Sequence, residues 1–259
     1  MNLPRVPMGR VPSLPTEAMR AIDAAALNAY AIDTTQLMEI AGFQVARAAV
    51  AVLGRVQGKR VVVAAGGGNN GGDALAAARF LFQRGAVVQV WMRANQRLSP
   101  LAARHRQTVE RLAIAVQDAS HTPLPAGDLV LDGLLGTGIQ LPLRAEVAAM
   151  IHAINQAASP VLAIDLPSGL DADSGAGRET CIQADWTVTL GLPKPALPAS
   201  PATGRLLVAD VGLPIPLFGT LADAVRQLYA EGAWSRFCRA RSRDHPAAFG
   251  TGVPGSRVP

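Results

Sequence analysis

From residue 60 onward, short apolar runs alternate with longer segments whose apolar residues recur every three or four positions. Apolar runs rich in β-branched residues are typical of buried strands, and a spacing of three or four is typical of amphipathic helices. The pattern predicts strands at 60–65, 86–92, 128–132 and 161–165, and helices at 72–84, 100–113 and 144–157. Strands and helices that alternate in this way form a parallel sheet with helices on both faces.

Further elements are predicted on either side of this alternation. Two helical patterns come first, from Thr16 to about Tyr30 and from Thr34 to about Leu53. Two later runs, Trp186 to Leu190 and Leu206 to Val211, predict strands that extend one edge of the sheet, and residues 221–234 predict a last helix. The expected fold class is therefore α/β, a Rossmann-like three-layer sandwich with a mostly parallel central sheet, helices on both faces and two N-terminal helices.

The chain of 259 residues is long enough for one large α/β domain or two small ones. We expect a flexible, proline-rich N-terminal arm at 1–13 and an ordered domain at 14–218. Residues 219–259 begin with the last predicted helix and continue into an arginine-, glycine- and proline-rich segment without apolar periodicity. We expect that segment to be disordered, because it cannot contribute to a core.

The net charge of +5 is concentrated at the C-terminal end. From Arg236 onward there are five arginines and one aspartate, a net charge of +4, which leaves +1 for residues 1–235. This nearly neutral body argues against a nucleic-acid-binding surface. No run approaches the roughly 18 apolar residues of a membrane span, and two isolated cysteines fit a reducing compartment. We therefore expect a cytoplasmic protein with no membrane segment and no nucleic-acid partner.

The most informative stretch is VVVAAGGGNNGGD at 61–73. Gly66, Gly68 and Gly71 satisfy the pattern G-x-G-x-x-G between a predicted strand and a predicted helix, which is the setting of a nucleotide phosphate site. A dinucleotide site also needs an acidic residue at the end of the second strand, and here that strand ends in Arg93. An arginine could accept a 2′-phosphate, so an NADP-dependent oxidoreductase remains an alternative. The two asparagines and the aspartate of the stretch are not needed by that motif.

Three carboxylates are predicted at the carboxyl ends of strands. Asp73 follows the first strand, Asp132 ends the strand LVLD, and Asp165 ends the strand VLAID. Ligands of open α/β sheets bind outside these strand ends, so we expect the three acids to rim one crevice. Each acid taken alone could instead cap the helix that follows it. Three together indicate that a cation or a proton is shared among them.

The polar side chains in this region suit a hard cation. Asn70, Asp132 and Ser168 offer oxygen donors without a nearby histidine or cysteine, which favours a group I or group II cation over zinc. One carboxylate among neutral oxygens favours a monovalent ion. The four histidines lack a paired serine or cysteine signature, and Ser168 lies in PSG rather than G-x-S-x-G, so a hydrolase triad is not expected.

Five motifs occur in an order that resembles one known family. They are GGGNNGGD at 66–73, LDGLLGTG at 131–138, AIDLPSGLDADSG at 163–175, the LPKP that contains Lys194, and VADVGLP at 208–214. Together they resemble the NAD(P)HX epimerase family, whose domain is known as the YjeF N-terminal domain, from about Leu14 to Pro216. Its members invert C6 of hydrated NADH or NADPH, so that a partner dehydratase can restore the cofactor.

The resemblance implies roles for particular residues. It implies substrate contacts by Asn69, Asn70, Gly71, Gly72, Asp73, Gly136, Thr137, Gly138, Ile139, Gln140, Leu141 and Pro142. It places Asp165 beside the reacting ring, where we expect it to carry the proton, and it implies a potassium ion held by Asn70, Asp132 and Ser168. Lys194 is either a phosphate contact or a solvated lysine.

The resemblance also bears on partners. It implies a homodimer, with the two N-terminal helices as the expected contact, and a dehydratase as functional partner. RARSRDHPAAFGTG, at 239–252, resembles the entry to the dehydratase domain of fused bacterial members, and we expect this chain to lack that second domain. The alternatives left open are the NADP-dependent oxidoreductase and a non-catalytic nucleotide-binding or scaffold module.

Overall fold

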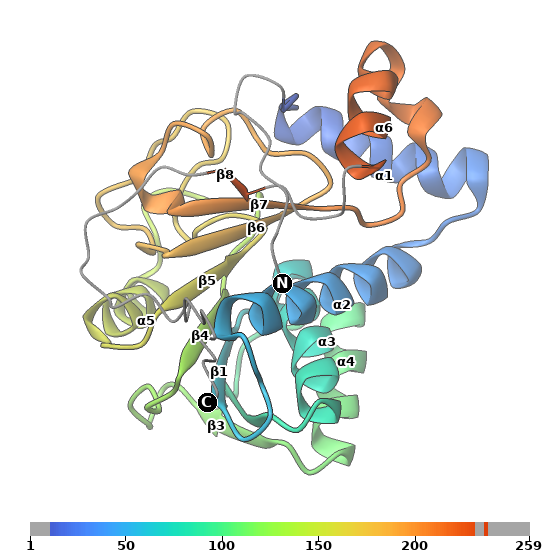
Figure 1. The fold of residues 1–259 in the computed structure, drawn as a ribbon. Coiled ribbons are helices and arrows are strands. Elements are labelled where there is room, and N and C mark those ends of the chain that lie inside the picture. Colours follow the sequence, from blue (N-terminus) through green and yellow to red (C-terminus); the bar gives the residue numbers. More distant parts are fainter. Residues whose placement is uncertain (1–10, 231–235, 238–259) are drawn as a thin grey trace, which may run out of the picture.

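The computed structural model describes residues 11–230 and 236–237, which form one eight-stranded sheet with helices on both faces (Figure 1). The strands are β1 (Arg60–Ala65), β2 (Val87–Met92), β3 (Ala115–Asp118), β4 (Leu129–Gly133), β5 (Val161–Ile164), β6 (Trp186–Leu190), β7 (Arg205–Ala209) and β8 (Arg236–Phe237). The α-helices are α1 (Thr16–Tyr30), α2 (Thr34–Leu53), α3 (Asn69–Gln83), α4 (Pro100–Arg111), α5 (Ala145–Gln156) and α6 (Ala222–Ala230).

The strand order is β3-β2-β1-β4-β5-β6-β7-β8, and only β8 runs antiparallel to its neighbour. β1 and β4 are adjacent, but the chain leaves β1 toward β2 and leaves β4 toward β5, in opposite directions along the sheet. Open α/β folds bind ligands at such a switch point, outside the carboxyl ends of the strands. The fold therefore directs attention to the loops after β1 and β4.

Alternate residues of the central strands supply two separate cores. In β1, Val61 and Val63 pack in the core that contains α2 and α3, whereas Val62 and Ala64 pack in the core that contains α5. This period of two is the side-chain alternation of a strand, and it makes the three-layer arrangement. The predicted fold class is confirmed.

Of the two N-terminal helices, α2 lies over α3, whereas α1 lies beside α6 (Figure 1). α2 packs along α3 and reaches β6 and β7, while α1 packs against a 3₁₀ segment at Ile215–Leu221. By length and composition α2 is apolar enough to cross a membrane, but half of its apolar window is buried inside the fold. Packing against α3 is therefore a sufficient explanation of its apolar character.

Most predicted elements are found within one to three residues of the expected bounds, and two expectations need correction. β3 was not predicted, because Ala115–Asp118 is a four-residue, half-buried edge strand with little apolar signal. α3 begins at Asn69 rather than residue 72, since the glycine-rich stretch that looks like a loop already forms the first helical turn. The predicted last helix is found over Ala222–Ala230. Most of the predicted N-terminal arm and most of the segment expected to be disordered lie outside the described residues, but Arg236–Phe237 of that segment forms the short strand β8, which pairs with β7.

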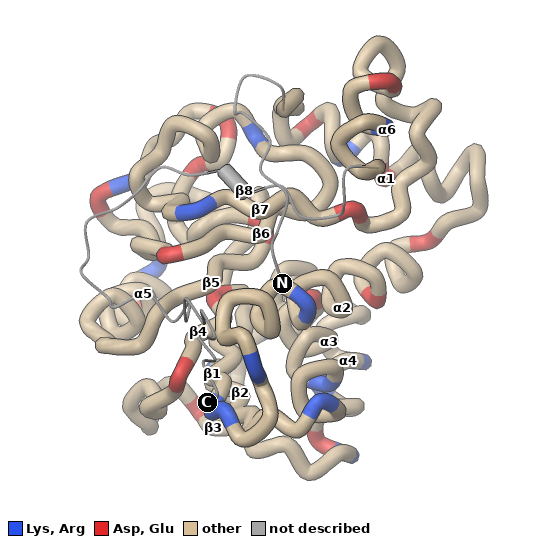
Figure 2. Tube along the Cα trace, in the orientation of Figure 1, with Lys and Arg blue, Asp and Glu red and all other residues tan. Residues whose placement is uncertain are grey.

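Basic and acidic residues are interspersed along the described chain (Figure 2). This distribution agrees with the small net charge expected for residues 1–235. The electrostatics of the site therefore depend on local groups rather than on a field of one sign across the molecule.

Candidate functional site

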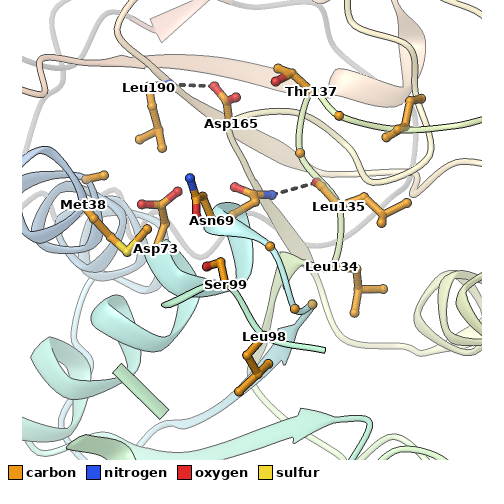
Figure 3. A pocket seen from close by; sticks show the side chains of 18 of the residues that line it. Met38, Asn69, Asp73, Leu98, Ser99, Leu134, Leu135, Thr137, Asp165 and Leu190 are labelled. Atoms are coloured by element: carbon orange, nitrogen blue, oxygen red, sulfur yellow. Dashed lines mark hydrogen bonds between the residues drawn. The ribbon is translucent and has the colours of Figure 1, made fainter. Parts of the chain in front are cut away.

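A pocket of about 1020 Å³ lies at the carboxyl ends of the parallel strands (Figure 3). Its walls come from the loops after β1, β2 and β4, from Asp165 at the end of β5, and from residues of α1 and α2. Small-molecule pockets usually measure about 300 to 1,000 Å³, so this one has room for a ligand of cofactor size.

The glycines after β1 allow two loops to touch. A methyl group on Gly66 would lie 1.8 Å from the carbonyl oxygen of Leu134, and one on Gly71 would lie 1.9 Å from the carbonyl oxygen of Gly66. A methyl group on Gly68, the N-cap of α3, would meet nothing within 4 Å. The start of α3 therefore opens onto the pocket, and its first N–H groups have no partner within the helix. Such a helix end favours an anionic group.

Asp165 occupies an unusual backbone conformation. Its φ is +65°, and the N–H of Leu166 donates to the carbonyl oxygen of Ile164 at 2.8 Å, which closes a three-residue γ-turn around Asp165. A positive φ in a residue other than glycine costs about 1–3 kcal/mol and is concentrated at functional sites. The turn holds the Asp165 side chain toward the pocket (Figure 3).

Among the residues that the structure describes, hydrogen-bond donors reach only one oxygen of the Asp165 carboxylate. Its Oδ1 accepts hydrogen bonds from the Leu190 N–H at 3.1 Å, the Thr189 hydroxyl at 3.3 Å and the Lys194 ammonium at 2.5 Å. Its Oδ2 accepts none from the described residues, so this oxygen is left for a ligand. An ammonium in contact stabilises a carboxylate in its charged form.

Lys194 is only 3% exposed, so the alternative of a solvated lysine is wrong. Its ammonium lines the pocket while it is paired with Asp165. A contact between Lys194 and a phosphate stays a prediction.

The three expected ion ligands lie together. Asn70 donates from Nδ2 to the carbonyl oxygens of Leu135 and Ile164, at 2.8 and 3.0 Å, and its Oδ1 is buried without a hydrogen-bond partner. The Ser168 hydroxyl donates to Asp132 at 2.6 Å and accepts from the Leu135 N–H at 2.8 Å. Leu135 thus connects Asn70 with Ser168, and Ser168 connects both with Asp132.

Asp132 and Ser168 are completely buried and lie beneath the pocket rather than on its wall. The expectation that three acids rim the crevice is therefore wrong for Asp132, since β4 ends one residue later, at Gly133. Burial raises the pKa of Asp132 to about 6, although the hydrogen bonds from Ser168 and Leu134 oppose that rise. A buried carboxylate with an orphaned amide oxygen nearby is an environment that a cation would stabilise.

Asp73 is also buried, but it does line the pocket. Its side chain lies between Met38 and Asn69 (Figure 3), and the residue is 9% exposed. The Asp73 carboxyl makes no hydrogen bond or ion pair with any residue that the structure describes. Burial raises its pKa well above the usual range; the charges of Asp165 and Asp23 raise it further, and Lys194 opposes them. Asp73 is the fifth residue of α3, so stabilisation of its charge by the first helical turn is not a sufficient explanation.

The structure brings most of the predicted substrate contacts to the pocket wall. The lining includes Asn69, Asn70, Asp73, Gly136, Thr137, Gly138, Ile139, Gln140, Pro142, Asp165 and Lys194. Gly71, Gly72 and Leu141 do not line it: the two glycines pack against protein atoms, and the Leu141 side chain is 43% exposed. Binding of a substrate by the lining residues stays a prediction.

One wall of the pocket was not foreseen. It includes Arg20 and Asp23 of α1 and Met38 of α2, and Arg20 donates to the Thr137 carbonyl oxygen at 3.3 Å. The loop at 93–100, after β2, forms another part. Nothing in the spacing of these residues predicts that α1 and α2 close over the strand ends, because this contact joins segments more than 100 positions apart.

Comparison with known proteins gives consistent similarities. The family described as YjeF-related protein N-terminus matches residues 34–196. The chain is 36% identical over 245 residues to the bifunctional NAD(P)H-hydrate repair enzyme Nnr of Moorella thermoacetica, a match over 90% of this chain and 46% of that protein. It is 33% identical over 226 residues to the NAD(P)H-hydrate epimerase of Rhodopirellula baltica, over 84% of this chain and 91% of that one. The chain thus spans about half the length of the bifunctional relative.

The fold has a solved counterpart. The crystal structure of the yeast protein YNL200c superposes with a TM-score of 0.71 at 24% identity, covering 80% of this chain and 92% of the yeast chain. That likeness concerns the fold alone. The family match extends over more than half of the chain and includes the glycine loop, Asp132, Asp165 and Lys194. The chain therefore belongs to the family described as YjeF-related protein N-terminus.

Proposed function

We propose that this chain is an isomerase, an NAD(P)H-hydrate epimerase that interconverts the R and S epimers at C6 of hydrated NADH and NADPH. The observation that carries the proposal is Asp165, whose carboxylate is fixed through one oxygen and open to the pocket through the other. The relatives named as NAD(P)H-hydrate repair enzyme and epimerase support it. We also propose, from the family resemblance, that a dehydratase acts on the epimer that this chain delivers.

The reaction needs proton transfer but no change of oxidation state. The hydroxyl at C6 leaves as water when the C6–O bond breaks, and the lone pair of the ring nitrogen forms a C6=N1 bond. Water then adds to C6 from the other face and loses a proton. We expect Asp165 to take up that proton, a role worth about 10² to 10⁴ in rate. The start of α3 binds the phosphates through its free N–H groups.

We further propose that the chain binds potassium through Asn70, Asp132 and Ser168. Support comes from the orphaned Oδ1 of Asn70 and from a donor set of neutral oxygens with one buried carboxylate. No cluster of three or more histidine, cysteine or acidic residues able to hold a metal occurs in the described part of the chain, which fits an ion other than zinc. The ion would stabilise the charge of Asp132 and join the loops that carry these residues.

Potassium is expected to stabilise the fold more than choline does at equal ionic strength. A ligand that binds only the folded state at ten times its Kd adds about 1.4 kcal/mol to the free energy of unfolding. Asp132→Asn should abolish this increment, whereas Asp128→Asn, at the opposite end of the sheet, should keep it. Thermal unfolding in the two salts measures the increment, and an equal increment in both variants would contradict the assignment.

An NADP-dependent oxidoreductase remains a second candidate because Arg93 directly follows β2 and lines the pocket. The Arg93 guanidinium lies 3.7 Å from the Glu146 carboxylate, so part of its charge is already balanced. Incubation with NADPH and carbonyl compounds separates the two functions. An epimerase leaves the dihydronicotinamide absorbance unchanged, and an oxidoreductase removes it.

We propose that the chain forms a homodimer through α1 and α2. Support comes from apolar side chains that these helices expose, at Leu27 (50%), Tyr30 (44%), Ile40 (36%) and Phe43 (38%). Leu27→Arg is expected to shift the protein from dimer to monomer in sedimentation, because the charge would have to be buried. Val87→Arg is the matched control, since Val87 is 52% exposed at the start of β2, away from these helices. A Leu27→Arg protein that stays dimeric would contradict this interface.

A further inference from the structure

Three carboxyl groups and one ammonium in the pocket wall act on one another electrostatically. Asp165 is paired with Lys194, and Asp23 is exposed on α1. Asp73 is different from both because it is buried and has no partner among the described residues. Burying an unpaired polar group is costly, so such a group in a pocket wall requires a functional explanation.

Asp73 and Asp165 reach the pocket from different elements. Asp73 belongs to α3, which follows β1, whereas Asp165 ends β5, and β4 lies between those two strands. Both residues line the same pocket, and the charge of Asp165 acts on Asp73. Inverting glycosidases use such a pair of carboxyl groups on the two sides of a ring carbon, one as acid and the other as base.

The two carboxyls lie in opposite environments. Asp165 accepts three hydrogen bonds, one of them from an ammonium. Asp73 lies beside Met38 without a donor among the described residues (Figure 3), and burial raises the pKa of its carboxyl. A pair of titratable groups held apart in this way divides into a proton donor and a proton acceptor.

We propose that Asp73 is the second proton-transfer group of the epimerase, giving its proton to the C6 hydroxyl as it leaves, while Asp165 receives the proton of the water that adds. The inference rests on the proposed function. The C6–O bond breaks with the proton of Asp73, the ring nitrogen supplies the electron pair for C6=N1, and the new C6–O bond forms as Asp165 takes a proton. After this step Asp165 holds the proton and Asp73 is the carboxylate. The same pair, acting in the opposite order, carries out the reverse reaction.

Asp73→Asn is the direct test, because the amide has the shape of the neutral acid and cannot donate its proton. We expect kcat to fall by about 10²- to 10⁴-fold in both directions, with KM changed less than about threefold. We also expect the alkaline limb of the kcat–pH profile to disappear, and Asp73→Glu to restore the limb and part of the rate. A residue that only shapes the pocket would change KM and leave the profile as it is.

Asp223→Asn is the matched control, since it makes the same change at an exposed carboxyl of α6 that does not line the pocket. Its effect on kcat should be much smaller than that of Asp73→Asn. Wild-type protein is assayed first: a wild type that does not accelerate epimerisation overturns the function and this inference together. An active wild type with an equally active Asp73→Asn variant overturns only the role of Asp73.

Stability provides a readout that does not depend on activity. Because the folded protein holds the proton of Asp73 more tightly than the unfolded chain, wild-type stability decreases as pH rises above the unfolded pKa of about 3.9. Asp73→Asn lacks this loss, so it should unfold at a higher temperature than the wild type at about pH 8, and the difference should shrink toward about pH 4. A difference that does not change with pH would overturn the assignment.

Discussion

Replacing Asp165 with asparagine is expected to lower kcat for epimerisation by about 10²- to 10⁴-fold while substrate still binds. The amide cannot take up a proton at neutral pH, but it keeps the shape of the side chain. Its oxygen can still accept hydrogen bonds from Leu190 and Lys194, so the γ-turn and the pocket wall should remain. Initial rates measured by proton NMR over a range of substrate concentrations separate kcat from KM.

The control for this substitution is Asp223→Asn, because the Asp223 side chain is 90% exposed on α6 and does not line the pocket. It should have the rate of the wild type. An Asp165→Asn variant that is folded and retains full kcat would show that Asp165 does not carry the proton.

The largest expected effect on stability is that of Gly71→Ala. The added methyl group would lie 1.9 Å from the carbonyl oxygen and 2.6 Å from the carbonyl carbon of Gly66. Both are backbone atoms, and Gly66 is itself in close contact with Leu134 of the loop after β4. Gly66 therefore cannot move away from residue 71 without disturbing the contact between the loops after β1 and β4. We expect a loss of about 3 kcal/mol or more in the free energy of unfolding, at the upper end of overpacking effects. Urea unfolding followed by circular dichroism measures it.

Gly68→Ala is the matched control three residues earlier. A methyl group at this position meets nothing within 4 Å, so the cost should be about 1 kcal/mol or less, from the weaker N-cap of α3. Equal losses for the two substitutions would mean that close packing of the loop does not require glycine at residue 71.

The alternation of strands and helices could be predicted because each central strand is buried on both faces and is therefore a continuous apolar run. The sequence of β1 shows this clearly, with its last five residues buried. β3 escaped prediction because an edge strand of four half-buried residues has no such run. The start of α3 was not predicted correctly because glycine and asparagine disfavour helices locally. In the structure, the packing of Gly71 and Gly72 against neighbouring segments stabilises the first turn.

The candidate site could be predicted in part. The positions of Asp165 and of the group Asn70, Asp132 and Ser168 follow from strand ends that meet at one edge of the sheet. The burial of Asp132 and the pairing of Lys194 with Asp165 depend on contacts between distant segments, which residue patterns do not specify. The same holds for the wall formed by α1 and α2.

The most direct measurement is the rate at which a sample of NADHX enriched in one epimer relaxes to the R/S equilibrium, followed by proton NMR with and without the protein. We expect the wild type to accelerate relaxation in potassium buffer and Asp165→Asn to lose most of that acceleration. Folded wild-type protein that leaves the rate unchanged would contradict the epimerase function and favour a non-catalytic nucleotide-binding module.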